Sequence, residues 1–201
     1  QAAGVHRGDR VLVQVEKSAE AVLLYLGCLR TGAVFVPLNT AYTASELEHF
    51  LGDAAPRLLV CDPAKLSLLA PLAQRHGVAR LETLAADGSG SWSEAISAQS
   101  GTEPDVPVAS CSSEDLASIV YTSGTTGRAK GAMLSHGNLE SNADALIGAW
   151  RFRDDDVLLH ALPVYHTHGL FTATNTVLLS GGTLLYRRSF DAGDVLRVMP
   201  E

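Results

Sequence analysis

The sequence predicts an α/β fold in which a mostly parallel sheet is flanked by helices. Short apolar runs alternate along the chain with longer segments whose apolar residues recur at helical spacing. This alternation is typical of parallel strands that are joined by helical crossovers. Hydrophobic residues make up 46% of the 201 residues and charged residues 18%, so the chain can bury a sizeable core.

The first half of the chain predicts a regular series of strands and helices. Ser18 is a good N-cap for a helix that runs to about residue 30. Thr-Ala-Ser-Glu at 43–46 is a capping-box pattern, which predicts that a second helix begins there. The predicted strands are 11–15, 34–36, 56–61 and 78–81, and the predicted helices are 18–30, 43–52 and 64–76.

The second half follows a segment rich in Gly, Ser, Pro and acidic residues, 86–113, which we interpret as a loop with one helical turn near 91–96. Asp-Asp-Asp at 154–156 is predicted to be a solvated turn, because nothing nearby completes the oxygen cage of a metal site. The predicted strands are 116–120, 131–134, 157–162 and 182–186, and the predicted helices are 136–150 and 169–179.

Residues 121–131, Tyr-Thr-Ser-Gly-Thr-Thr-Gly-Arg-Ala-Lys-Gly, lie between two predicted strands. Glycines let the backbone approach a ligand, and both backbone N–H groups and hydroxyls donate to phosphate oxygens. Lys130 adds a positive charge that suits a phosphate. The spacing differs from a Walker A loop, in which the lysine directly follows the second glycine. The composition predicts a cradle for a polyphosphate, and the alternative interpretation is a flexible polar hairpin.

The motif at 121–131 resembles the signature loop of the adenylate-forming (AMP-binding) superfamily, which includes acyl-CoA synthetases, luciferases and the adenylation domains of peptide synthetases. Two further segments resemble the same family and occur in its order. They are Leu-Arg-Thr-Gly-Ala-Val-Phe-Val-Pro-Leu-Asn at 29–39 and Leu-Pro-Val-Tyr-His-Thr-His-Gly-Leu at 162–170. The resemblance covers about residues 10–186 and implies part of the large N-terminal domain of these enzymes.

The resemblance implies an acid–thiol ligase (an AMP-forming acyl-CoA synthetase) that uses ATP, Mg²⁺ and coenzyme A and serves fatty acid metabolism. A small carboxylate is first activated as an acyl-adenylate and then transferred to the thiol. Because an anion must attack a polyanion, positioning, Mg²⁺ and aimed donors do most of the catalytic work.

The resemblance also implies which residues form the site. Lys130 and His166 are the catalytic candidates, with His166 lining the pocket where the carboxylate meets the α-phosphate, and Thr122 is expected near Mg²⁺. We interpret His160 as structural, and a zinc site formed with His168 is not expected because no Cys or acid shares the spacing. The expected ATP-binding residues are Thr122, Ser123, Gly124, Thr125, Thr126, Gly127 and Lys130.

Within the family, residues 160–179 most resemble the malonyl-CoA synthetases, so malonate is the expected substrate. The alternatives are a fatty-acyl-CoA synthetase, an adenylation domain that loads a carrier protein, and a nucleotide-binding module without chemistry. A distal carboxylate calls for an arginine fork. We interpret Arg187 and Arg188 as solvated surface charges and expect that arginine beyond Glu201.

We interpret residues 1–201 as a fragment of the N-terminal AMP-binding domain, truncated at both ends and lacking the C-terminal domain. Residue 1 is not Met, and the family's downstream motifs, including its C-terminal catalytic lysine, do not occur in the chain. The fragment alone is therefore expected to be inactive.

Composition excludes several other classes of protein. The chain has 15 basic and 22 acidic residues, a net charge of −7, which makes it a poor candidate for general nucleic-acid binding. It has no apolar run long enough to predict a membrane span. Cys28, Cys61 and Cys111 are far apart without a C-x-x-C pattern, which indicates a reducing, cytoplasmic compartment rather than a disulfide framework.

Overall fold

The computed structural model describes residues 4–98, 107–122 and 128–199, and these fall into two compact units. The first unit extends to His136, and the second begins at Gly137.

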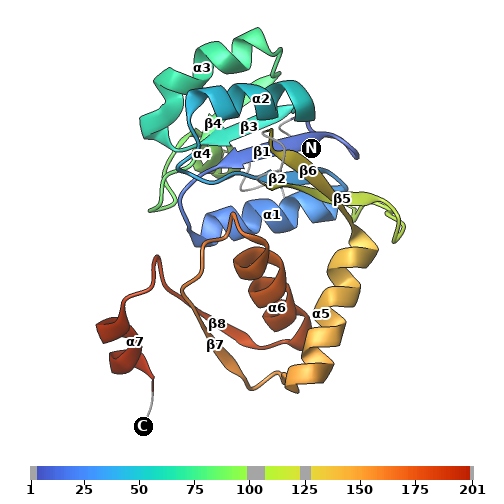
Figure 1. Ribbon diagram of the computed structural model, residues 1–201, viewed down its shortest axis with the longest axis vertical. Helices are drawn as coiled ribbons and strands as arrows, with labels where there is room; N and C mark the ends of the chain where they lie inside the picture. The colour runs from blue at the N-terminus through green and yellow to red at the C-terminus, as the bar shows by residue number, and fades with distance from the viewer. Residues whose placement is uncertain (1–3, 99–106, 123–127, 200–201) are drawn as a thin grey trace. The chain divides into compact units, whose positions relative to one another are not determined.

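A six-stranded sheet with the order β4-β3-β1-β2-β5-β6 forms the first unit (Figure 1). The pairs β4–β3, β3–β1, β1–β2 and β2–β5 are parallel, and β5–β6 is antiparallel. The predicted α/β fold with a mostly parallel sheet is therefore confirmed. The strands are β1 (Arg10–Gln14), β2 (Val34–Pro37), β3 (Leu58–Cys61), β4 (Arg80–Thr83), β5 (Leu116–Thr122) and β6 (Lys130–Ser135).

Helices cover both faces of this sheet. The connection through α1 (Ala19–Thr31) moves along the sheet from β1 to β2, and the connection through α2 (Ala44–Ala54) moves back from β2 to β3. Because parallel crossovers are right-handed, connections that move in opposite directions lie on opposite faces. Accordingly, α2 and α3 (Leu66–Arg75) lie on one face and α1 on the other (Figure 1). The 3-10 turn η1 (Pro63–Lys65) precedes α3, and α4 (Ser91–Ser97) follows β4.

Local signals fix where the first helices begin. The hydroxyl of Ser18 accepts a hydrogen bond from the N–H of Ala21 at 3.1 Å, which caps α1. Thr43 and Glu46 form a reciprocal capping box at the start of α2. Both helix starts agree with the sequence prediction, whereas the strand predicted at 78–81 is displaced by two residues to β4.

The main hydrophobic core of the first unit lies between the sheet and helices α2 and α3. Central strands that are covered on both faces are continuous apolar runs, as expected for a parallel sheet. Tyr121 from β5 also belongs to this core, so the hairpin that β5 starts is joined to the body of the unit. The buried members are Leu12, Val34, Val36, Leu38, Leu47, Phe50, Leu51, Ala54, Leu59, Cys61, Leu69, Leu72, Ala73 and Tyr121.

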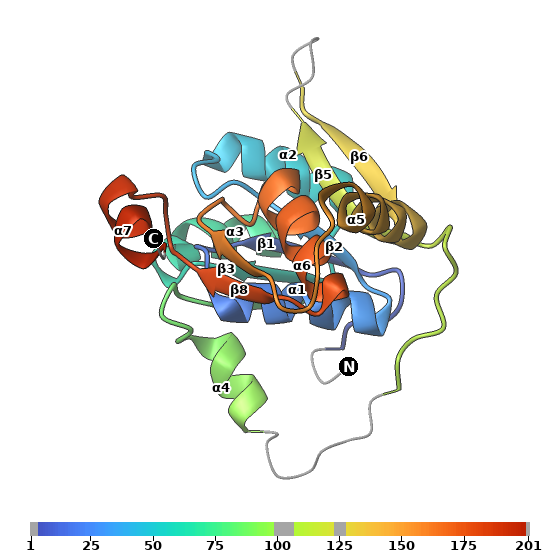
Figure 2. The same cartoon turned by 90° about the horizontal axis from the view of Figure 1, so that it is seen from below.

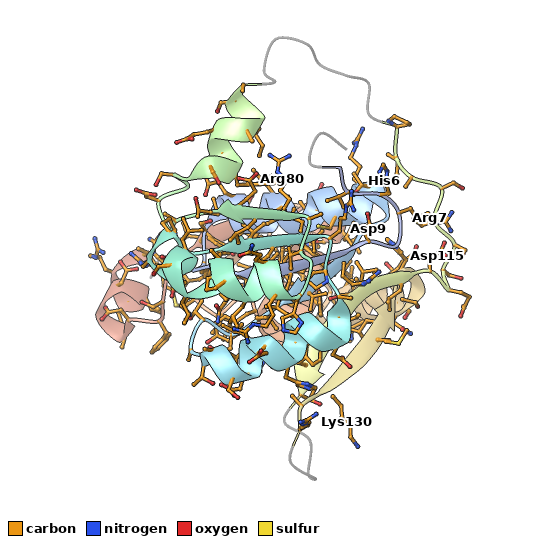
Figure 3. The ribbon with its side chains drawn as sticks, turned by 90° about the horizontal axis from the view of Figure 1, so that it is seen from above. His6, Arg7, Asp9, Arg80, Asp115 and Lys130 are labelled. Atoms are coloured by element: carbon orange, nitrogen blue, oxygen red, sulfur yellow. The ribbon has the colours of Figure 1, made fainter. Side chains whose placement is uncertain are left out.

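Two polar contacts hold β5 against the rest of the first unit. The buried hydroxyl of Ser118 donates to the carbonyl of Phe35 in β2 at 2.6 Å. Just before β5, Arg7 Nη2 lies 2.6 Å from Asp115 Oδ2 (Figure 3). The hydrogen bond from Arg7 and another from the N–H of Ser112 lower the pKa of the Asp115 carboxyl to about 2.

The second unit contains the long helix α5 (His136–Trp150) and a small parallel sheet of β7 (Val157–His160) and β8 (Thr183–Tyr186). A π-helical segment, η2 (His168–Asn175), and the short helix α6 (Thr176–Ser180) connect the two strands. The predicted strand at 157–162 ends early, at His160, and the predicted helix at 169–179 begins one residue early as a π-helix. A short helix, α7 (Ala192–Val198), follows β8.

None of the helices in the described part of the chain combines the length and apolar character that a membrane crossing requires. All three cysteines are free thiols. Cys28 and Cys61 are buried, whereas Cys111 is partly exposed.

The cysteines should therefore react at different rates. Burial raises the pKa of Cys28 to about 12 and, helped by the nearby Asp62, that of Cys61 to about 11. Since the thiolate is the reactive species, alkylation of both by iodoacetamide at pH 8 should be on the order of tenfold slower, or more, than that of Cys111. Peptide mass spectrometry measures this, with the urea-unfolded protein as control. Equal labelling of Cys28 and Cys111 in the native protein would contradict the expectation.

Candidate functional site

The hairpin of β5 and β6 brings two predicted site residues together. Thr122 is the last residue of β5 and Lys130 the first of β6, and they are direct cross-strand partners. Side chains of directly opposed residues emerge on the same face of an antiparallel pair. Both residues are exposed, and Figure 3 places Lys130 at the connected end of the hairpin, where β5 leads on to β6. The other predicted phosphate ligands, Ser123, Gly124, Thr125, Thr126 and Gly127, lie outside the described residues.

The next pair in the hairpin explains why the motif has a glycine after its lysine. Gly131 lies opposite Tyr121, and the two strands run side by side at the edge of the sheet (Figure 2). A Cβ atom at Gly131 would approach Cγ2 of Ile119 to 2.7 Å and Cε1 of Tyr121 to 3.4 Å. Only a residue without a side chain fits there without displacing its neighbours.

Helix α2 holds both strands of the hairpin. The hydroxyl of Tyr121 donates to Asp53 Oδ2 at 2.6 Å, and Nε2 of His49 lies 3.0 Å from the carbonyl oxygen of Ala129. Burial and the bond to Asp53 raise the pKa of Tyr121 well above its usual range, so the hydroxyl stays a neutral donor. Neither contact is indicated by a local sequence pattern, because the partners lie 68 and 80 residues apart.

The connected end of the hairpin carries a hydroxyl group and an ammonium group, both of which can bind a polyphosphate. Within the described part of the chain, Lys130 forms no ion pair with a carboxylate, so its ammonium group is available to an anionic ligand. The hydroxyl oxygen of Thr122 is a hard ligand of the kind that Mg²⁺ prefers. Among the described residues, no group of three or more His, Cys, Asp or Glu side chains is arranged to hold a metal ion.

His166, the second catalytic candidate, belongs to the second unit, whereas Thr122 and Lys130 belong to the first. It lies between β7 and η2, and its side chain is exposed. Its carbonyl accepts a hydrogen bond from the N–H of Leu170 at 2.9 Å, so the backbone of His166 starts the following helical segment. The imidazole remains available to a ligand.

His160 is buried, with 1% of its surface exposed, in agreement with the structural role inferred from the sequence. Its Nε2 donates to the carbonyl of Gly169 at 2.8 Å, and the hydroxyl of Thr174 donates to the same oxygen at 2.9 Å. Its ring also packs on Tyr186 of β8 at a centroid distance of 5.1 Å. These contacts tie the end of β7 to η2 and so fix the ends of the segment that carries His166.

The structure explains why residue 169 is a glycine, which the sequence alone did not reveal. A Cβ atom there would lie 2.1 Å from the carbonyl oxygen of Pro163 and 3.2 Å from Cβ of Leu162. The turn of residues 163–169 therefore closes on a backbone that carries no side chain.

A cavity of about 230 Å³ lies in the second unit. Most of its lining is apolar, and four polar residues also contribute: His160, His168, Thr172 and Thr176. His166 does not line it. The cavity contains no Asp, Glu, Lys or Arg side chain among its lining residues. It therefore suits an apolar group.

The interpretation of Arg187 as a solvated charge is wrong. Its Nε lies 2.7 Å from Asp194 Oδ2, and 29% of its side chain is exposed. Asp194 is in the first turn of α7 and also pairs with Arg197. The pairing arises because α7 folds back beside the end of β8, which no local pattern indicates. Arg188 is exposed, as expected.

Comparison with known families and curated proteins gives extensive matches. Residues 1–200 match the family described as AMP-binding enzyme. A feruloyl-CoA synthase of an Amycolatopsis species is 34% identical over 201 residues, which are 100% of this chain and 38% of that protein. The mitochondrial malonate–CoA ligase ACSF3 of Mus musculus is 36% identical over 188 residues, 93% of this chain and 31% of that protein. The chain thus spans between 31% and 38% of the length of these relatives.

Solved structures resemble the chain as well. Apo MatB from Rhodopseudomonas palustris is 49% identical, with a TM-score of 0.92, over 98% of this chain and 38% of that one. ATP-bound MatB from the same organism is 50% identical, with the same TM-score and the same coverage. The N-terminal domain of FACL13 from Mycobacterium tuberculosis is 28% identical, with a TM-score of 0.79, over 98% of this chain and 48% of that one.

The close approach at Gly169 predicts a specific sensitivity. Replacing Gly169 by Ala should lower the free energy of unfolding by about 1–3 kcal/mol, because the new methyl group overlaps the carbonyl of Pro163. The matched control is Gly148→Ala in α5, where nothing lies within 4 Å of a built Cβ. That change should be neutral or stabilise by up to about 1 kcal/mol. Urea denaturation measures both, and equal effects at the two glycines would refute the packing argument.

Proposed function

The chain belongs to the AMP-binding enzyme family and has the fold of its N-terminal domain, and from this premise we propose that the complete protein is an ATP-dependent CoA ligase. The observation that carries the proposal is the pairing of Thr122 with Lys130 at the connected end of the hairpin. The ammonium group of Lys130 is exposed there and available to a phosphate. The activity is proposed for the complete protein, because the chain spans 38% or less of the relatives compared above that are named as CoA ligases or synthases.

The proposed reaction has two steps. A carboxylate oxygen of the substrate attacks the α-phosphorus of ATP, and pyrophosphate leaves. The sulfur of coenzyme A then attacks the acyl carbon, and AMP leaves. The ammonium group of Lys130 would bind the β- and γ-phosphates and offset the negative charge that collects on the departing pyrophosphate. Mg²⁺, when bound near Thr122, neutralises further phosphate charge.

His166 is proposed to face the reacting carboxylate. Its exposed side chain and its fixed backbone, held at both ends by the contacts of His160 and Leu170, give it a defined starting position. A neutral or charged imidazole can donate one hydrogen bond to a carboxylate or phosphate oxygen. That bond would orient the nucleophile toward phosphorus, which is the main catalytic need of this reaction.

We propose malonate as the carboxylate. Two observations support it: the resemblance of residues 160–179 to malonyl-CoA synthetases, and the relatives named as malonate–CoA ligases from mouse, human and Arabidopsis. The distal carboxylate of malonate needs a charged partner, because burying it unpaired would be costly. Arg187 is already engaged by Asp194, so the partner is expected elsewhere in the complete protein.

The second candidate is an apolar or aromatic carboxylic acid. The cavity of the second unit favours this candidate, because no acidic or basic residue other than histidine lines the cavity. The relative named as a feruloyl-CoA synthase, at 34% identity, points in the same direction. An apolar cavity accommodates such an acyl group without desolvating a second charge.

A reducing compartment such as the cytoplasm is proposed for the protein. Cys28, Cys61 and Cys111 are free thiols, and two of them are buried where they would serve no redox exchange. The mouse relative is itself named as mitochondrial, so a reducing organelle matrix fits the same thiols.

Lys130→Ala in the complete protein should slow adenylation by about 100- to 1,000-fold, because the substitution removes the preorganised positive charge that would face the departing phosphates. Pyrophosphate exchange measures the rate, and the melting temperature should stay unchanged because the side chain is exposed. The matched control is Arg128→Ala, which removes an equal, exposed charge two residues away. Normal exchange in Lys130→Ala would sink the assignment of Lys130.

Substrate choice separates the two candidates. If the protein is a malonate ligase, kcat/KM should be highest for malonate, lower for methylmalonate, and lower by about two orders of magnitude or more for acetate, octanoate and ferulate, which lack the second carboxylate. CoA-thioester formation by the complete protein measures this. A preference for octanoate or ferulate over malonate would mean that the acyl site is an apolar pocket.

A further inference from the structure

Two side chains of α2 reach the hairpin, one on each of its strands. His49 and Asp53 are four residues apart, so they lie on the same face of the helix. Asp53 accepts the hydrogen bond of Tyr121 in β5, and His49 reaches the carbonyl of Ala129, which directly precedes β6. A carbonyl oxygen can only accept, so Nε2 of His49 carries the proton. Figure 3 shows α2 beside the end of the hairpin that carries Lys130.

These two bonds fall next to the two candidate phosphate ligands. Tyr121 immediately precedes Thr122, and Ala129 immediately precedes Lys130. Each ligand is therefore attached to a residue that α2 holds at a fixed distance, 2.6 Å on one strand and 3.0 Å on the other. The helix, in turn, is anchored by its capping box and by the main core.

The ring of Phe50 docks α2 on the hairpin independently of these bonds, whereas the ring of His49 contributes both packing and a hydrogen bond. The ring centroids of Phe50 and Tyr121 are 4.4 Å apart, and those of His49 and Tyr121 are 6.3 Å apart at an edge-on angle of 67°. Phe50 is 1% exposed and Tyr121 6% exposed. Because burial of these rings holds the helix in place, we expect the protein to stay folded when a single polar atom is removed.

We propose that His49 and Asp53 are positioning residues that set the geometry of Thr122 and Lys130 toward the phosphates of ATP. The proposal rests on the proposed function, since it assumes that these two residues bind the β- and γ-phosphates. In this proposal neither His49 nor Asp53 contacts the nucleotide directly. Each acts through the backbone neighbour of a ligand, one on either side of the motif.

A purely structural role predicts a different result from a positioning role. If the two bonds only stabilised the fold, losing one would lower the melting temperature and weaken every nucleotide alike. ATP and pyrophosphate carry the phosphates that Thr122 and Lys130 would contact, whereas AMP lacks them. A positioning role therefore predicts weaker binding of ATP and pyrophosphate with unchanged binding of AMP.

The experiment uses the complete protein, with Mg²⁺ and without carboxylate, in calorimetric titrations with ATP, pyrophosphate and AMP. His49→Ala and Asp53→Ala should each raise the Kd for ATP by about 3- to 10-fold, the effect of losing one hydrogen bond, while the Kd for AMP stays the same. Asp53→Asn keeps an acceptor for Tyr121 and His49→Gln keeps a donor, so both should restore most of the affinity.

Two further variants sharpen the test. Tyr121→Phe removes the same hydrogen bond as Asp53→Ala and keeps the ring. The double variant that combines Tyr121→Phe with Asp53→Ala should therefore bind ATP no more weakly than either single variant. The matched control is Glu48→Ala on the same helix, which breaks the ion pair with Arg75 and touches neither strand of the hairpin. Its affinities for ATP and AMP should both be unchanged.

The outcomes separate this proposal from the one on which it rests. If the folded wild-type protein binds no ATP, the proposed function fails and the positioning role falls with it. If the wild type binds ATP but His49→Ala and Asp53→Ala bind it equally well, or if ATP and AMP weaken in parallel, the positioning role alone is overturned. Selective loss of ATP and pyrophosphate affinity supports it.

Discussion

The antiparallel pairing of β5 with β6 is the constraint on which the candidate site depends. Parallel strands need a long crossover connection, whereas antiparallel neighbours can be joined by a short one. Only such a hairpin places Thr122, at the end of one strand, directly opposite Lys130, at the start of the next. The rest of the first unit serves this pairing, because Ser118 joins β5 to β2 and Arg7 holds Asp115 just before β5.

The polar end of the hairpin and its buried base have opposite requirements, and the sequence meets both within a few residues. Tyr121 is buried and packs on Phe50, while the next residue, Thr122, is exposed. Successive side chains of a strand point to opposite faces of the sheet, so Tyr121 packs in the core while its neighbour Thr122 is available to a ligand. A rigid base under a polar end is what a site needs when it binds charge by preorganised donors.

Much of the fold and part of the site could be predicted from the sequence. The capping residues Ser18 and Thr43 act on groups within three residues, so their signals are local and the helix starts were placed correctly. The contacts of α2 with Tyr121 and Ala129 span 68 and 80 residues, and no periodicity encodes which distant side chains will meet. The error at Arg187 has a different origin, because its partner Asp194 is only seven residues away, in a short helix, α7, that the sequence analysis did not predict.

Gly131 also determines which alignments of the hairpin are possible. Sliding β6 by one residue in either direction would bring Lys130 or Ala132 opposite Tyr121, and each has the Cβ atom for which there is no room beside Ile119. A one-residue slip would also turn every side chain of β6 to the other face. A misaligned hairpin would therefore have to displace the side chain of Ile119 before its strands could close. Gly131 thus helps to specify the strand register that places Lys130 opposite Thr122.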